Sequence, residues 1–235
     1  LDNFMWQIQI NDSTETYTTE NLLYKFSEPG DYDINLKVKS NYGCSDSVTI
    51  PFPLRPVIEI RNHPYFEDFE SGMDGWGTMI TTDEVTVSWK FGISESDFPV
   101  DSGLNYWYTS INQGVKEDSW ILSPCFDFTG SIGPMVKFNS WRSFDQLRDG
   151  TVMQYTDDNG KNWHNIGDLD DGIKWYNEYA IQGMPGGQAI GWSNIRDNDW
   201  IEMRHNLDSL RKKSPVQFRI AYGSDGTYSD NKGFA

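Results

Sequence analysis

Three histidines limit the catalysis that this chain of 235 residues could perform: His63, His164 and His205. None lies in a His-Glu-x-x-His pattern, and no Gly-x-Ser-x-Gly pattern offers a nucleophile for one of them. Acidic residues are numerous enough that a pair of carboxylates for glycoside hydrolysis remains an open alternative. Nothing in the sequence singles out a catalytic residue, so we expect a protein that is not an enzyme.

Charge and cysteine content exclude several classes of partner and cofactor. The 35 acidic residues outnumber the 19 basic ones, for a formal net charge of −16, and the two cysteines, Cys44 and Cys125, are isolated. Such a surface repels nucleic acid, and two lone cysteines form neither a zinc site nor a disulfide scaffold. Carboxylates attract Ca²⁺, although acidity also has the simpler explanation of solubility. No apolar run is long enough for a membrane helix, so we expect neither nucleic-acid binding nor membrane insertion.

Aromatic residues make up 15% of the chain and are the second kind of side chain that could bind a ligand. In extended chain, 106–108 and 175–176 place neighbouring rings on opposite faces. One ring of each set would then face the core and another could face solvent, where exposed rings bind sugars and protein partners. We therefore consider Trp107 and Trp175 as carbohydrate-binding candidates, with packing in the core and its rim as the alternative.

The elements that must position these residues are strands. Apolar and polar residues alternate with period two over five segments: 32–39, 85–91, 135–139, 151–155 and 216–222. The residues Asn159 and Gly160 are typical of a tight hairpin turn. A single short helix is expected over 208–213. Many short strands without long helices between them predict an all-β fold of the sandwich or jelly-roll kind.

Three prolines in six residues, Pro51, Pro53 and Pro56, predict a break in regular strand pairing. We interpret them as the start of a stiff, extended linker between two domains. The expected division is 1–55 for the first domain, 56–64 for the linker and 65–235 for the second domain.

The segment 24–36, with its Tyr-x-Phe and Pro-Gly-x-Tyr-x-Ile-x-Leu pattern, resembles the closing half of a PKD (polycystic kidney disease) repeat. Residues 40–47 extend the likeness to the form found in secreted proteins of the Bacteroidota. The family's opening motif is degenerate here, and 4–8 is its nearest equivalent. The resemblance implies the C-terminal part of an immunoglobulin-like β-sandwich, a spacer or interaction module.

The second domain resembles MAM-like and cleaved-adhesin jelly-roll modules. Four segments carry the likeness: 66–76, 118–127, 138–163 and 218–225. The resemblance implies a β-jelly-roll sandwich whose opening strand, at 66–70, lies beside its closing strand. Residues 233–235 match the start of the family's closing motif, whose two aspartates would lie beyond Ala235, so we expect a module truncated before its last strand.

Many relatives of the jelly-roll module hold a structural Ca²⁺ with a Glu of the opening strand and an Asp of the closing strand. The resemblance implies Glu70 as the first ligand here, and Asp68 as the second because the two would share one face of a strand. The alternative is that both carboxylates are solvated. Residues 156–163 also fit the Asp-box pattern of sialidase propellers, but a single copy predicts a structural hairpin and not a propeller.

The two resemblances together point to large cell-surface adhesins of the Bacteroidota, which are exported by the type IX secretion system and in some cases serve gliding motility. The expected function is a non-catalytic adhesion or stalk segment at the bacterial cell surface. Its expected partners are the neighbouring domains of the same long chain and surface glycans or proteins. The alternatives are a carbohydrate-binding module and an ancillary domain of a secreted hydrolase or protease.

Overall fold

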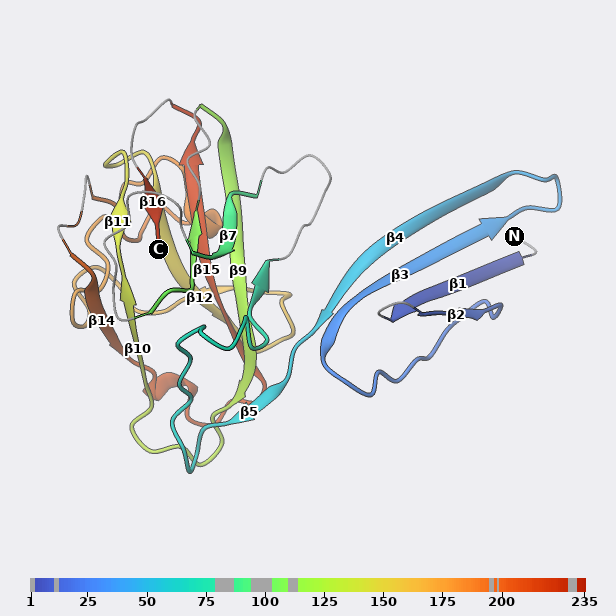
Figure 1. Cartoon of the computed structure of the whole chain (residues 1–235), viewed down its shortest axis with the longest axis horizontal. Coiled ribbons are helices and arrows are strands. Elements are labelled where there is room, and N and C mark those ends of the chain that lie inside the picture. The colour runs from blue at the N-terminus through green and yellow to red at the C-terminus, as the bar shows by residue number, and fades with distance from the viewer. Residues whose placement is uncertain are drawn as a thin grey trace. The chain divides into compact units, whose positions relative to one another are not determined.

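The computed structural model describes residues 3–10, 13–78, 87–93, 103–109, 114–194, 197, 199–227 and 232–235. It divides into two compact units, Leu1–Pro56 (unit 1) and Val57–Ala235 (unit 2) (Figure 1). Strands dominate both units, which confirms the all-β prediction. The predicted helix over 208–213 is only a 3₁₀ turn, η2 (Asp208–Leu210), and the predicted strand residues 85–86 lie outside the described part of the chain.

Unit 1 contains one antiparallel sheet in the order β2-β1-β3-β4. Its strands are β1 (Asn3–Ile10), β2 (Ser13–Tyr17), β3 (Gly30–Lys39) and β4 (Ser45–Leu54). The period-two alternation gives this sheet an apolar and a polar face, with Trp6 opposite Leu36 and Ile8 opposite Ile34 on the apolar one. Phe26, from the connection between β2 and β3, packs on that face, with its ring 4.5 Å from Tyr32.

The prediction that prolines interrupt pairing is wrong for β4. Pro51 pairs with Asp33 and Pro53 with Asp31, so the β3–β4 ladder continues through both prolines. Because β4 is an edge of the described sheet, a proline whose nitrogen points away from β3 removes no ladder hydrogen bond. The predicted linker 56–64 also contains a strand of unit 2, β5 (Val57–Glu59), which pairs in parallel with β9.

The larger sheet of unit 2 has the order β13-β12-β15-β9-β5, with β6 also paired to β9. Its other strands are β6 (Gly77–Thr78), β9 (Lys116–Asp127), β12 (Gly150–Thr156), β13 (His164–Asn165) and β15 (Val216–Asp225). β15 lies between β9 and β12 and is antiparallel to both, which places three long strands at the centre of the unit.

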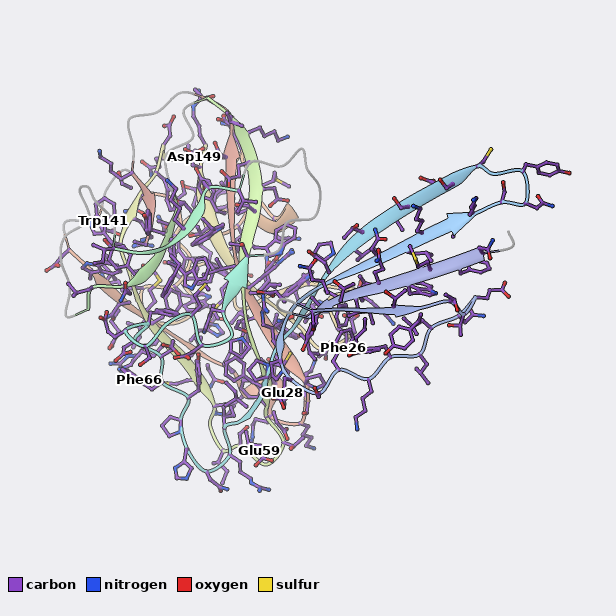
Figure 2. The ribbon with its side chains drawn as sticks, turned by 45° about the vertical axis from the view of Figure 1, so that its right-hand side comes forward. Phe26, Glu28, Glu59, Phe66, Trp141 and Asp149 are labelled. Carbon is purple, nitrogen blue, oxygen red and sulfur yellow. The ribbon has the colours of Figure 1, made fainter. Side chains whose placement is uncertain are left out.

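The remaining strands of unit 2 form three antiparallel pairs. These are β7 (Trp89–Gly92) with β8 (Tyr106–Thr109), β10 (Met135–Ser140) with β14 (Ile201–Asn206), and β11 (Arg142–Ser143) with β16 (Gly233–Phe234). Backbone bonds between Trp141 and Ala235 extend the β11–β16 pairing to the end of β10, and β16 also contacts β8. These strands form the second layer of a β-sandwich. Trp141, labelled in Figure 2, is fully buried.

The predicted opening strand at 66–70 is wrong, whereas the predicted closing strand lies beyond Ala235 and its place beside the opening segment stays a prediction. The opening segment 64–70 is not a strand, the first strand of unit 2 pairs with β9, and β16 pairs with β11. The resemblance did not indicate that the carboxylates of Glu67 and Asp68 accept hydrogen bonds from backbone N–H groups two residues further on, which favours turns over a strand.

Candidate functional site

The acidic segment 64–70 contains the predicted calcium ligands. Phe69 has a φ of 61°, Glu67 Oε1 accepts a hydrogen bond of 2.7 Å from the Phe69 N–H, and Asp68 Oδ1 accepts one of 3.1 Å from the Glu70 N–H. Such side-chain-to-backbone bonds are typical of tight turns. The argument that a strand places Asp68 and Glu70 on one face therefore does not hold.

Glu70 fastens this segment to a part of the chain far away in sequence. Its Oε1 accepts hydrogen bonds from the backbone N–H groups of Leu104 (2.6 Å) and Asn105 (2.8 Å). A Cβ on Gly103 would lie 2.9 Å from the same oxygen, so glycine allows this close approach. The carboxylate of Glu70 therefore acts as the acceptor that holds residues 103–105 against the opening segment.

The fit of calcium to this segment is partial. Ca²⁺ takes six to eight oxygen ligands, and Asp68 and Glu70 supply carboxylates of the right type. Within the described ranges, no group of three or more His, Cys, Asp and Glu side chains is arranged to hold a metal ion. The two residues are thus at most part of a coordination sphere, and calcium binding stays a prediction.

The two candidate aromatic ligands are buried, which corrects the expectation that they face solvent. Trp107 is 7% exposed and packs 5.3 Å from Phe91, whereas Trp175 is 3% exposed and its ring lies 4.9 Å from Trp192. Trp175 Nε1 donates to the carbonyl of Ile166 at 2.7 Å. Both rings belong to the core of unit 2, which is the alternative that the sequence analysis left open. Neither ring offers a surface for a sugar.

A stack of aromatic and cationic side chains on the large sheet was not predicted. The guanidinium of the buried Arg219 lies 4.5 Å from the Trp120 ring and 4.4 Å from the Trp163 ring. Its Nε donates to Gln154 Oε1 at 2.7 Å, and burial lowers the pKa of Arg219 to about 10. Arg219 is therefore a cation held between two indoles, and the stack fastens Trp163 to the sheet.

The Asp-box residues form a structural hairpin, as predicted. Asp158 accepts hydrogen bonds from the Asn162 N–H (2.9 Å) and the Thr156 hydroxyl (2.8 Å), which lower the pKa of Asp158 to about 2. Asn159 and Gly160 have φ values of 60° and 82°, as a tight hairpin turn requires. The motif thus shapes the connection from β12 to β13.

His205 is likewise placed for structure. His205 Nε2 lies 3.1 Å from Asp171 Oδ2, and its ring packs 4.8 Å from the Trp175 ring. His63 and His164 are exposed. The two contacts of His205 join β14 to the segments that carry Asp171 and Trp175, and neither partner is a nucleophile that a histidine base would activate.

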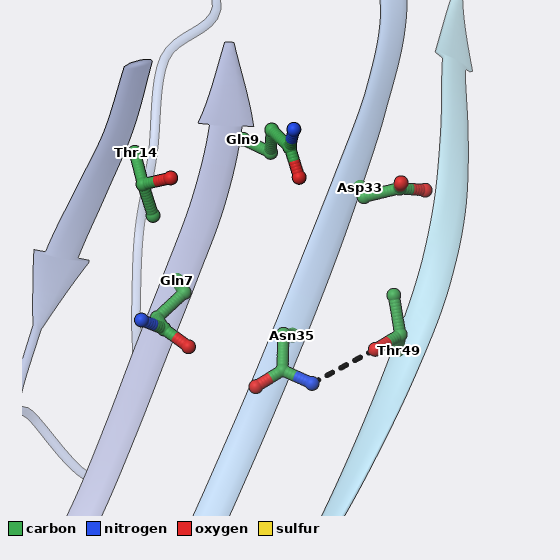
Figure 3. A pocket seen from close by; sticks show the side chains of 6 residues that line it. All are labelled: Gln7, Gln9, Thr14, Asp33, Asn35 and Thr49. Carbon is green, nitrogen blue, oxygen red and sulfur yellow. Dashed lines mark hydrogen bonds between the residues drawn. The ribbon is translucent and has the colours of Figure 1, made fainter. Parts of the chain in front are cut away.

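A hollow of about 340 Å³ lies on the polar face of unit 1 (Figure 3). The side chains that line it come from all four strands of the sheet: Gln7 and Gln9 of β1, Thr14 of β2, Asp33 and Asn35 of β3, and Thr49 of β4. The alternation that turns Ile8 and Ile34 to the apolar face turns these residues to the opposite one. Sequence reasoning missed the site because the lining residues become neighbours only through strand pairing.

One hydrogen bond within the hollow orders its centre. Asn35 Nδ2 donates to Thr49 Oγ1 at 2.8 Å and to the backbone carbonyl of Val48 at 3.3 Å. Both N–H donors of the Asn35 amide are thereby used, and Figure 3 shows its oxygen on the side toward β1. Asp33 is the lone charged residue among the six that line the hollow, so the site offers amides, hydroxyls and one carboxylate.

No protein-family model and no curated protein sequence matches this chain. A solved structure described as "Structural basis for the promiscuous specificity of the carbohydrate-binding modules from the beta-sandwich super family" aligns over 99% of this chain and 81% of its own, with 16% identity and a TM-score of 0.36. A TM-score of this size supports no inference about function. None of the described helices is long and apolar enough to span a membrane.

Proposed function

We propose that this chain is a non-catalytic segment of a large secreted cell-surface adhesin. The observation that carries the proposal is that side chains capable of catalysis or ligand binding make structural contacts instead. Glu70 holds a loop, Asp158 shapes a hairpin and Arg219 fastens an aromatic stack, so groups that serve chemistry elsewhere serve structure here. A tandem of acidic β-units with only Arg55 and Pro56 between the strands β4 and β5 suits a spacer or adhesive stalk.

The finer assignment rests on the sequence resemblances. We infer that unit 1 is the C-terminal part of a PKD-like repeat and that unit 2 is a MAM-like or cleaved-adhesin module. By the same resemblances the parent is a Bacteroidota surface protein, exported by the type IX system and in some relatives used in gliding. Its partners would be neighbouring domains of the same chain together with surface glycans or proteins.

Surface labelling tests this proposal. Antibodies raised against the chain should label intact cells that produce the parent protein, and mild protease treatment of those cells should remove the signal. Beads coated with the chain should adhere to the surfaces that these cells colonise. Labelling that appears only after the cells are permeabilised would contradict the proposal.

The second candidate is a carbohydrate-binding module or an ancillary domain of a secreted hydrolase or protease. The polar hollow of unit 1 favours it, because amide and hydroxyl groups suit a hydroxyl-rich ligand. The full coding sequence separates the two candidates. Many further β-modules would support the adhesin, whereas an adjoining catalytic domain would support the ancillary role.

We also propose a structural Ca²⁺ bound with the help of Glu70 and Asp68. A ligand that binds only the native state stabilises it, so the calcium chelator EGTA should lower the Tm and added Ca²⁺ should restore it. Glu70→Gln should lower the Tm through its lost loop contacts and should abolish the response to EGTA. Superimposable melting curves of the original chain with and without chelator would reject the ion.

A further inference from the structure

The polar hollow of unit 1 is built from two parallel rows of side chains that cross the sheet. Gln7 pairs with Asn35, and Asn35 pairs with Thr49, which gives the first row. Gln9 pairs with both Thr14 and Asp33, which gives the second row. Neighbouring strands lie about 4.8 Å apart, and rows two residues apart are separated by about 7 Å.

The chemistry of these rows is that of a site for hydroxyl groups. The amides of Gln7 and Gln9 each offer two donors and an acceptor, whereas Asn35 offers only its oxygen because its donors bond to Thr49 and Val48. Each hydroxyl can donate and accept, and the Asp33 carboxylate accepts. Figure 3 shows Gln9 and Asp33 on adjacent strands, with Gln7 and Asn35 in the next row. A ligand with many hydroxyls can satisfy donors and acceptors in both rows together.

The charges and residue types that line the hollow limit the class of ligand that can bind there. The six lining residues include one carboxylate, Asp33, and no Lys or Arg, and the chain carries a net charge of −16, so the hollow itself disfavours phosphorylated, sulfated or uronic-acid ligands. The lining also has no aliphatic or aromatic residue, so it offers no pocket to the side chains of a peptide. Neutral ligands rich in hydroxyls remain.

One part of the site, Asn35 and Thr49, is held by a hydrogen bond before a ligand arrives. Strands hold all six residues, and Asn35 is fixed by its bonds to Thr49 and Val48. Side chains on a sheet lose little freedom on binding when their neighbours already hold them. Gln9, Thr14 and Asp33 are exposed, which leaves the second row accessible from solvent, and Thr49 of the first row is exposed as well.

We propose that the face formed by Gln7, Gln9, Thr14, Asp33, Asn35 and Thr49 binds a neutral oligosaccharide. This assignment rests on the proposed adhesive role and adds to it the residues and the class of ligand. The proposed carbohydrate site is therefore not at Trp107 and Trp175, which are buried in unit 2. It lies on the polar face of the sheet of unit 1.

A glycan array with neutral, sulfated and uronic-acid oligosaccharides tests the proposal on the whole chain. We expect binding to neutral glycans, and calorimetry with the best of them should show about a tenfold loss of affinity for Asn35→Ala and for Gln9→Ala. Thr49→Ala and Ser47→Ala form a matched pair, because both remove a hydroxyl from the same face of β4 and only Thr49 lines the hollow. The first should weaken binding and the second should not.

Three outcomes would overturn the assignment. These are the absence of any neutral glycan above background, equal binding by Asn35→Ala, Gln9→Ala and the original chain, and a preference for acidic glycans. Hydrogen exchange over β1 and β3 shows whether each variant keeps the folded sheet, and Gln9→Ala removes no hydrogen bond from the described sheet. Surface labelling of intact cells decides the adhesin proposal separately, so the two ideas can fail independently.

Discussion

Unit 2 and unit 1 are made of the same kind of strand but bury their apolar faces to different degrees. In unit 2, which has two layers of strands, the side chains of Trp141, Tyr176 and Trp192 are fully buried. In unit 1, Val48 and Ile50 lie on the apolar face of β4, opposite Leu36 and Ile34, yet they are 52% and 55% exposed. Residue types alternate in strands of both units, for example in β4 and in the first half of β15.

The difference shows that a period-two pattern gives a sheet an apolar face but not the layer that covers it. An apolar face stabilises a fold only where another element removes it from water. Unit 2 has a second layer, whereas the described part of unit 1 covers its sheet with the segment between β2 and β3. We therefore expect substitutions in unit 2 to have large effects on stability and comparable substitutions in unit 1 to have small ones.

The buried ion pair of unit 2 should give the largest effect. Arg142 Nε and Nη2 lie 2.7 and 3.3 Å from the two carboxylate oxygens of Asp197, and both side chains are buried. Asp197→Ala leaves the guanidinium without its counter-charge and should lower the free energy of unfolding by about 3–5 kcal/mol. Urea unfolding followed by tryptophan fluorescence measures it, since Trp6 is the one tryptophan outside unit 2.

An exposed pair of the same unit is the control. Lys137 Nζ lies 3.2 Å from Glu202 Oε2, and both side chains face solvent. Because water screens such a pair, Lys137→Ala should change stability far less than Asp197→Ala does. Equal effects from the two variants would mean that burial does not set the strength of the contacts in unit 2.

The next largest effect should be a pH dependence of the stability of unit 2. It arises from Asp149, which lies just before β12. Burial, followed by the nearby charges of Asp225 and Asp145, raises the pKa of Asp149 to about 6, from a usual value of 3.8. The folded state therefore holds a proton that the unfolded state releases near pH 4. Its contribution to stability is complete below about pH 4 and is lost as the pH rises to about 6.

Asp149→Asn isolates this contribution, because the other titrating groups are common to both proteins. Relative to the Asn variant, the original chain should lose up to about 3 kcal/mol between pH 4 and pH 7. Urea unfolding of both proteins at each pH provides the comparison. A difference in stability that does not change with pH would show that Asp149 titrates normally in the folded protein.

Trp163→Ala should have a smaller effect, at the edge of the large sheet. It removes one of the two rings that enclose Arg219 and exposes the guanidinium to water. The expected loss of stability is about 1–2 kcal/mol, the range for a partly desolvated cation–π contact. Trp163→Phe keeps an aromatic face and should recover part of the loss in the same unfolding experiment; a Phe variant no more stable than Ala would count against the stack.

The sequence was sufficient to predict the strands in which apolar and polar residue types alternate, although β12 and β15 are buried on both faces. The segments 32–39, 151–155 and 216–222 became parts of β3, β12 and β15 because a regular pattern of this length fits a sheet and not a helix. The hairpin at Asn159 and Gly160 was predictable for a local reason, since its positive φ values depend on those two residues.

The errors arose where neighbours distant in sequence decide the structure. Pro51 and Pro53 fit into β4 because β4 is an edge, which no local pattern indicates. Trp107 and Trp175 lie on the covered side of their segments, and the alternation did not specify which side that is. The polar hollow was missed because Gln9, Thr14 and Asp33 form a row only after three strands pair.

The smallest expected effect tests the comparison most directly. Ile50→Thr in β4 and Ile220→Thr in β15 make the same change in a strand, at residues that are 55% and 7% exposed. Thr is well tolerated in strands, so Ile50→Thr should change the stability of unit 1 by less than about 0.5 kcal/mol. Ile220→Thr places a hydroxyl in the core and should lower the stability of unit 2 by about 1–3 kcal/mol.

Hydrogen exchange over β3 and β4 reports the stability of unit 1, and tryptophan fluorescence reports that of unit 2. If Ile50→Thr destabilises unit 1 as strongly as Ile220→Thr destabilises unit 2, then the apolar face of β4 is buried in solution. Light scattering at two protein concentrations would then separate burial by self-association from burial within one chain, because only the former changes with concentration. If self-association covers this face, the two units differ in what buries their apolar faces. A second copy of the chain does so in unit 1, and a second layer of strands does so in unit 2.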